Sequence, residues 1–311
     1  MRKSLYTQNA GKTSIQGVPS DHYGNAKGSK WDLARNRAFK GYSIVVLQLI
    51  RESYAVDEYV GFPRFDFKKP SKALKKKGFK VIRFVEIPPS PNELEVILTK
   101  ASQLWIISGN TKKLNSHHLA VIQKFHESGR GLFIWGDNPP WIADANFILK
   151  EMFSTRLSGN YEGEQILSEA TESSIVGFRA HLITTGINQL YEGSTISSVK
   201  LHSSLERVIT SSDGKCVTAC YDNGNSRAII DGGFTRLYNK WDNAGTARFV
   251  VNCAAWLVNL ERNEAGIQEE EKKEIIAADM RNIVGFAKKS VNKLTKTITE
   301  LFKSMKKKFK K

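Results

Sequence analysis

The chain has 311 residues, of which 41% are hydrophobic, and its formal net charge is +16 at pH 7. This hydrophobic content is too high for a disordered protein, and no apolar run approaches the roughly 20 residues that a membrane-spanning helix needs. The three cysteines, Cys216, Cys220 and Cys253, are too few and odd in number for a disulfide framework. We therefore expect a cytoplasmic protein.

Residues 1–40 are basic, and up to about residue 29 they are rich in Ser, Gly, Asn, Gln and Lys without hydrophobic periodicity. Such a composition predicts a disordered basic arm. Within this arm, Trp31, Leu33 and Phe39 are suited to attach a short segment to the body of the protein. No apolar segment follows Arg2 and Lys3, so we expect no signal peptide.

Strand-like and helix-like segments alternate from residue 43 onward. The run from Ser43 to Ile50 is apolar except at Gln48, as in a strand covered on both faces of a sheet. The expected elements are strand 43–50, helix 71–77, strand 79–85, helix 91–98, strand 104–107, helix 115–128 and strand 132–135. This alternation predicts parallel strands joined by right-handed crossovers.

The second half of the body is less regular. Residues 153–212 show only short β-like pieces, whereas 216–221 and 227–230 read as strands joined by a turn at 222–225. Residues 246–259 have helical spacing of apolar side chains. The sequence thus predicts one α/β domain over residues 41–262, built on a doubly wound, mostly parallel sheet.

Residues 263–311 differ in composition from the body. They begin as an acidic linker, and from about residue 275 apolar side chains recur at steps of three and four. These stripe residues are Val284, Ala287, Val291, Leu294, Ile298, Leu301 and Met305. We expect a basic amphipathic C-terminal helix.

Basic side chains gather at two places that are candidates for binding an anionic partner. The first is the stretch from Lys68 to Arg83, with eight basic and no acidic residues. Its expected helix carries Lys72, Lys75, Lys76 and Lys77. The second is the tail, with Lys288, Lys289, Lys293, Lys296, Lys303, Lys306, Lys307 and Lys308 as the candidate residues. Such residues suit an anionic membrane or an acidic protein partner.

Each basic region also has alternative interpretations. A lysine-rich helix face can simply be solvated, and the tail can pack on its own domain or form a coiled coil. Nucleic acid is a further possible partner of the tails. Only Phe286, Phe302 and Phe309 lie among the tail lysines, which argues mildly against base stacking.

Three sequence blocks carry a family resemblance. They are Gln103–Asp137, which holds a strand, a helix and a strand ending in Trp-Gly-Asp; His181–Gly193; and Arg227–Phe234 followed by Trp241-Asp-Asn243. Together they resemble the class I glutamine-amidotransferase-like fold, a flavodoxin-like architecture. The third block is similar to the non-catalytic branch found in gliding-motility and intraflagellar-transport proteins.

The catalytic cysteine of this family is missing. The resemblance implies a nucleophile on a tight turn after a strand, but the strand ending at Trp135 continues into Gly136-Asp137-Asn138-Pro139-Pro140. Covalent catalysis needs a nucleophile with a base in reach. We therefore expect no glutaminase activity and lean towards a protein that is not an enzyme.

Polar residues at the carboxyl ends of the expected strands form a candidate ligand pocket. Ligands of open parallel sheets bind at this edge. The residues are Ser108, Asn110, Asp137, Asn138 and Asp231. Asp137 and Asp231 suit a paired-carboxylate or metal site, although both stand beside glycine, where aspartate commonly stabilises turns. Cys216 and Cys220 would lie about 13 Å apart on a strand, too far to share a metal, and we expect no cofactor and no metal.

We therefore expect a non-catalytic, amidotransferase-like binding or scaffold module, tethered to an anionic surface by its C-terminal helix as a peripheral membrane protein. The alternatives are a hydrolase-type enzyme that uses the strand-end pocket around Asp137 and Asp231, and a nucleic-acid-associated protein that uses its basic tails.

Overall fold

The computed structural model describes residues 5–51, 65–238 and 240–260. The predicted C-terminal helix and its lysines lie outside these residues. None of the helices in the described ranges combines the length and apolar character that a bilayer crossing requires.

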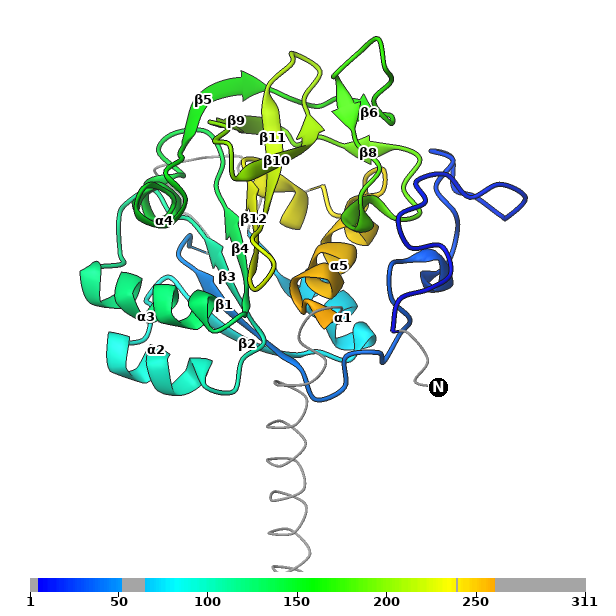
Figure 1. The fold of residues 1–311 in the computed structure, drawn as a ribbon. Helices are drawn as coiled ribbons and strands as arrows, with labels where there is room; N and C mark the ends of the chain where they lie inside the picture. Colours follow the sequence, from blue (N-terminus) through cyan, green and yellow to red (C-terminus); the bar gives the residue numbers. More distant parts are fainter. Residues whose placement is uncertain (1–4, 52–64, 239, 261–311) are drawn as a thin grey trace, which may run out of the picture. The chain divides into compact units, whose positions relative to one another are not determined.

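The centre of the fold is an eight-stranded sheet with the order β2-β1-β3-β4-β12-β11-β10-β7 (Figure 1). The first five strands in this order are parallel to one another, and β12, β11, β10 and β7 pair antiparallel. Their bounds are β1 Ser43–Gln48, β2 Lys80–Val85, β3 Gln103–Ile107, β4 Gly131–Trp135, β7 Gly177–Phe178, β10 Leu205–Thr210, β11 Cys216–Asp222 and β12 Arg227–Asp231. The predicted mostly parallel α/β sheet is confirmed.

Helices cover both faces of this sheet. Helices α1 (Lys68–Lys77) and α5 (Thr246–Leu257) pack on one face, and α2 (Pro91–Leu98), α3 (Ser116–Glu127) and α4 (Ala143–Phe153) pack on the other (Figure 1). Strand β1 is fully buried because its alternate side chains enter the two separate cores, Ile44 on the α1 and α5 side and Val45 on the other. Burial on both faces explains why its sequence is continuously apolar.

The irregular region between α4 and β10 forms two small antiparallel pairs above the carboxyl edge. They are β5 (Leu157–Glu162) with β9 (Thr195–Val199), and β6 (Ile166–Leu167) with β8 (Leu190–Tyr191). Short 3₁₀ helices span Ser29–Trp31, Leu182–Thr184 and Phe234–Leu237.

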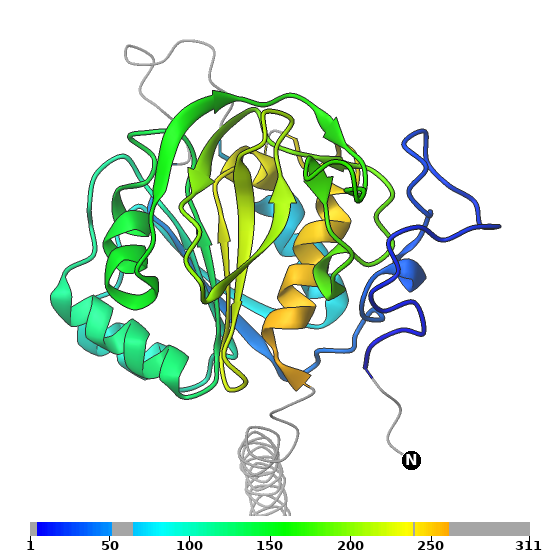
Figure 2. The ribbon, with the colours of Figure 1, turned by 45° about the horizontal axis from the view of Figure 1, so that its top comes forward.

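The prediction of a disordered N-terminal arm is wrong for residues 5–40. This segment belongs to the same compact unit as the sheet and runs beside α5 and the β8 region (Figure 2). Asn252 of α5 accepts a hydrogen bond from the Leu33 amide at 2.7 Å, and Arg248 donates to the carbonyls of Ala26 and Gly28. The polar composition suggested disorder, but side chains more than 200 residues away satisfy its backbone groups.

Candidate functional site

Asp137 and Asp231 lie at the carboxyl ends of neighbouring strands. Asp231 ends β12, and Asp137 follows β4 by two residues. The two strands are parallel neighbours, and the Gly136 amide donates a hydrogen bond to the Asp231 carbonyl at 2.9 Å. Burial is the main cause of the raised pKa of Asp137, and the nearby charge of Asp231 raises it slightly further.

The Asp231 carboxylate is fully used inside the protein. It forms an ion pair with Arg236, and both side chains are 0% exposed. It also accepts hydrogen bonds from the Thr218 hydroxyl at 2.6 Å and the Gly233 amide at 2.9 Å. A buried carboxylate requires such partners, and here they leave Asp231 no exposed oxygen for a ligand. The charge of Asp231 therefore stabilises the fold through these contacts.

Asp137 is buried but only partly satisfied. Its side chain is 1% exposed, and its Oδ1 accepts hydrogen bonds from the Thr195 hydroxyl and the Asn138 amide, each at 2.8 Å. Among the described residues, no donor lies within hydrogen-bonding geometry of its Oδ2. Burial raises the pKa of this carboxyl to about 7, against the opposing effect of its hydrogen bonds. Near neutral pH it therefore holds its proton for much of the time.

The other predicted pocket residues do not join these two carboxyls. Ser108 is buried, and its Oγ accepts hydrogen bonds from the amides of Asp144 and Ala145, so it supports the first turn of α4. Asn110 is exposed, and Asn138 is half-buried with its amide directed to the Pro139 carbonyl at 3.4 Å. The described contacts therefore do not join these five residues into a single ligand site.

Asp144 is a buried residue at this edge that sequence reasoning missed. Its Oδ1 accepts hydrogen bonds from the amides of Lys113 and Leu114 at 2.8 and 2.9 Å. Burial raises the pKa of this carboxyl. An aspartate in the first turn of a helix is so common that the sequence gives no signal of this role.

The cysteines and His181 are structural within the described residues. Burial raises the pKa of all three thiols, so none is poised as a thiolate. His181 accepts a hydrogen bond from the Ile183 amide and packs edge-on against Trp256, and burial lowers its pKa to about 4. No group of three or more potential ligands in the described ranges could hold a metal ion.

The basic surface of α1 is smaller than predicted because Lys77 points inward. Its ammonium is buried, 2.8 Å from the Asp32 carboxylate, and it also donates to the Ala34 carbonyl. Burial lowers its pKa, whereas Asp32 raises it. Lys77 is therefore excluded from the candidate anion-binding residues, and Lys72, Lys75 and Lys76 remain exposed.

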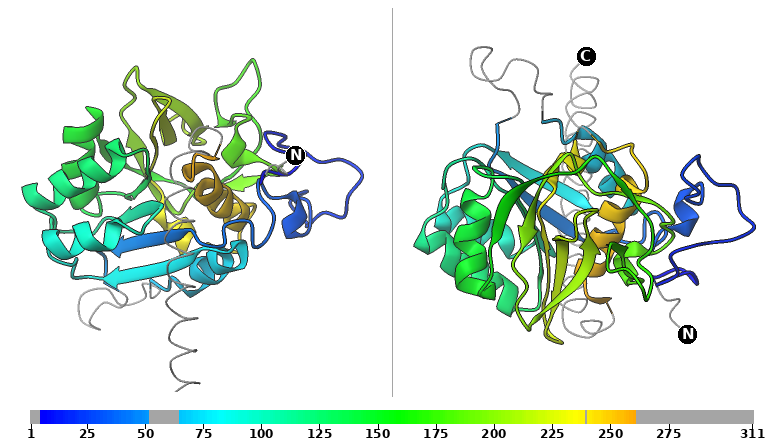
Figure 3. Two further views of the ribbon diagram at one scale, coloured as in Figure 1. Left: turned by 60° about the horizontal axis from the view of Figure 1, so that its bottom comes forward. Right: turned by 90° about the horizontal axis from the view of Figure 1, so that it is seen from above.

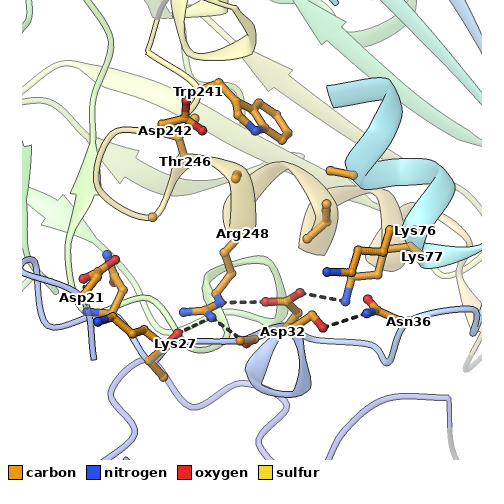
Figure 4. A pocket seen from close by; sticks show the side chains of 18 of the residues that line it. Asp21, Lys27, Asp32, Asn36, Lys76, Lys77, Trp241, Asp242, Thr246 and Arg248 are labelled. Carbon is orange, nitrogen blue, oxygen red and sulfur yellow. Dashed lines mark hydrogen bonds and ion pairs between the residues drawn. The ribbon is translucent and has the colours of Figure 1, made fainter. Parts of the chain in front are cut away.

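Asp32 lies between Lys77 and Arg248 at the base of a hollow of about 430 Å³ (Figure 4). The Arg248 Nε and the Asp32 carboxylate are 2.8 Å apart. Residues 21–36 form one wall, and α1, α5 and residues 241–245 supply the others. These charges connect the N-terminal segment to the two helices, so their first role is structural.

A second, basic hollow of about 340 Å³ lies between α1 and β2. It is lined by Phe67, Lys68, Ser71, Lys72, Lys75 and Arg83. The α1 residues recur at steps of three and four, so they share one face of the helix. Of the described residues, no acidic side chain lines this hollow, and the Asp66 carboxylate lies 3.8 Å from the Lys68 ammonium. It is the described part of the protein best suited to meet an anion.

The fold and these sites define a doubly wound α/β domain in which the carboxyl-edge charge of Asp231 is engaged internally. No family model matches the sequence, and no curated protein shows significant sequence similarity to it.

Solved structures are distantly similar. A cytoplasmic protein from Salmonella typhimurium LT2 aligns with a TM-score of 0.44 and 12% identity, covering 70% of this chain and 98% of its own. A ThuA-like protein from Parabacteroides merdae aligns with a TM-score of 0.45 and 11% identity, covering 70% and 90%. An exo-β-1,4-mannosidase from an Opitutaceae bacterium aligns with a TM-score of 0.38 and 11% identity, and this chain spans only 36% of its length.

Proposed function

We propose that the α/β domain is a non-catalytic binding module of the amidotransferase-like type, held at an anionic surface by basic residues of α1 and of segment 275–311. The first half of the proposal, that the module is non-catalytic, rests on the residues at the end of β4. Where the resemblance implies a nucleophile, the chain presents Asp137, which is buried and bonded to Thr195. No thiolate is available in the described residues, because burial raises the pKa of every cysteine.

The second half of the proposal, that the module is held at an anionic surface, rests on the distribution of its exposed basic side chains. Lys72, Lys75 and Lys76 are exposed and have no ion-pair partner among the described contacts. The tail adds eleven basic and two acidic side chains over residues 275–311. Basic side chains near an anionic bilayer contribute about 1 kcal/mol each to binding, and the apolar stripe of the tail suits the acyl boundary.

The hydrolase alternative has one observation in its favour, the raised pKa of Asp137, which is typical of general acids. Its geometry is unfavourable, however. A general acid must reach a substrate. Asp137 is 1% exposed, and none of the hollows described here is lined by Asp137 or Asp231. We therefore favour the binding module.

The test is co-sedimentation of the full-length protein with vesicles of phosphatidylcholine, with or without phosphatidylserine. We expect binding only to the anionic vesicles, and weaker binding as salt is raised towards physiological strength. Replacing Leu294 and Leu301 with Asp should lower it, because charges on the apolar stripe oppose insertion. The same protein should release no ammonia from glutamine.

Equal binding to both kinds of vesicle, or binding to neither, would refute the anionic-surface half of the proposal. Release of ammonia that is lost on mutation of a cysteine would refute the non-catalytic half.

A further inference from the structure

Strand β2 forms an edge of the sheet within the described residues. It is the end strand, and β1 is its only neighbour among the described strands. None of its side chains is fully buried, whereas every side chain of β1 is. In the left view of Figure 3, β2 is the outermost cyan arrow beside β1 in blue. Such edges require protection or a partner.

One side of this edge is basic. Arg83 of β2 faces the hollow that Lys68, Lys72 and Lys75 of α1 also line. Arg83 donates to Gln48 at 2.7 Å, so its guanidinium is held in place. The ammonium groups of Lys72 and Lys75 have no partner among the described contacts. This arrangement presents several cations in one concave surface.

The other side of the edge is apolar. A hollow of about 530 Å³ lies between β2 and α2, lined by Phe84, Ile87, Pro88, Pro89, Asn92, Glu93, Val96 and Ile97. Ile87 is 78% exposed and Val96 is 70% exposed, the two highest values among the exposed large hydrophobic residues. Helix α2 buries Leu94 and Leu98, so Val96 lies where a soluble helix ordinarily carries a polar side chain.

The acidic residues around the apolar hollow are already engaged. Glu86 pairs with Arg51 at 2.8 Å and Glu95 pairs with Lys124 at 2.6 Å. Glu93 accepts hydrogen bonds from the amide and hydroxyl of Ser90, at 2.8 and 2.6 Å, in the N-terminal cap of α2. Ion pairs therefore offset the charges of Glu86 and Glu95, whereas Glu93 is held by neutral donors. On the α1 side of the edge, Lys72 and Lys75 are cations with no ion-pair partner among the described contacts.

Consecutive residues of a strand point to opposite faces of the sheet, so Arg83 and Phe84 place the basic and the apolar hollow on either side of one strand. We propose that the β2 edge is itself a contact surface for an anionic lipid bilayer. Ile87 and Val96 enter the interface, while Lys68, Lys72 and Lys75 meet the phosphate headgroups. This inference rests on the proposed function, which already includes basic residues of α1, and it adds the β2 edge and the apolar hollow beside it to the membrane contact.

Three variants of the full-length protein test this surface in the vesicle assay. Ile87→Asp with Val96→Asp removes the apolar contact, and Lys72→Glu with Lys75→Glu reverses the basic one. Ile175→Asp is the matched control, because Ile175 is 57% exposed and lies in the segment before β7, the strand at the other end of the sheet. Near-ultraviolet circular dichroism checks that each variant is folded.

Both β2-edge variants should bind anionic vesicles at least about tenfold more weakly than the wild type. This loss corresponds to about 1.4 kcal/mol of binding free energy. Ile175→Asp should bind as the wild type does. The inference is overturned if the folded β2-edge variants bind normally. If Leu294→Asp with Leu301→Asp then abolishes binding, the tail alone holds the protein at the anionic surface, and the proposed function stands for segment 275–311 without α1 and the β2 edge.

A second copy of the chain is the competing occupant. In sedimentation velocity, the wild type and the variant with Ile87→Asp and Val96→Asp should show the same oligomeric state. A dimer lost in that variant would assign the β2 edge to self-association and overturn the lipid assignment.

Discussion

Replacing Asp137 with Asn should change how the stability of the protein depends on pH. The carboxyl is 1% exposed and its pKa rises from 3.8 to about 7, mainly because burial disfavours the ionised form. Asn has nearly the same shape, can keep the hydrogen bonds from Thr195 and Asn138, and does not ionise. The substitution therefore isolates the free energy of ionising this one buried group.

The expected magnitude follows from the two pKa values. At about 1.36 kcal/mol per pKa unit, ionising Asp137 in the folded protein costs on the order of 4 kcal/mol. The folded-state pKa is the higher one, so the native protein binds more protons than the unfolded chain between pH 3.8 and about 7. The stabilising contribution of protonated Asp137 is complete below pH 3.8 and is lost as the pH rises through about 7.

Urea denaturation of wild type and variant at several pH values measures this effect. From about pH 5 to about pH 8 the stability of the wild type relative to Asp137→Asn should fall by on the order of 3 kcal/mol. His181 and His126, whose pKa values burial lowers, change stability in the opposite direction, but they are present in both proteins and cancel. Asp242→Asn, which removes an exposed carboxylate, controls for the loss of one charge.

A relative stability that stays constant across this range would refute the reasoning. It would mean that Asp137 ionises at an ordinary pH, and therefore that water or a partner reaches the Oδ2 atom.

Two further predictions concern the packing of the domain. Arg236→Met should destabilise the protein by about 3–5 kcal/mol in urea denaturation, because it leaves the Asp231 carboxylate buried without its counter-ion. Adding Asp231→Asn should recover part of the loss, and a cost below about 1 kcal/mol would contradict the buried pair. Asn252→Ala removes the acceptor of the Leu33 amide, so limited proteolysis should cleave residues 5–40 faster than in the wild type. Unchanged cleavage would mean that other contacts suffice to hold this segment.

The sequence by itself determined the parallel half of the fold. The run Ser43–Gln48 is apolar on both faces, and the glycine after Lys77 ends a helix, with φ of 110°. These signals are local, because strand periodicity and helix termination depend on neighbouring residues. The sequence also determined the absence of a cysteine after Trp135, and hence the expectation that glutamine is not hydrolysed.

Only the tertiary structure decided which charged residues are available to partners. Lys77 looked like its neighbours Lys75 and Lys76, yet it is buried against Asp32, 45 residues earlier in the chain. The sequence predicts Asp231 as a ligand-pocket carboxylate, but in the structure it forms a buried ion pair with Arg236. The polar segment of residues 5–40 looked disordered because some of its hydrogen-bond partners, such as Asn252, lie far along the chain on α5. Each of these outcomes depends on contacts between distant residues, which no local pattern contains.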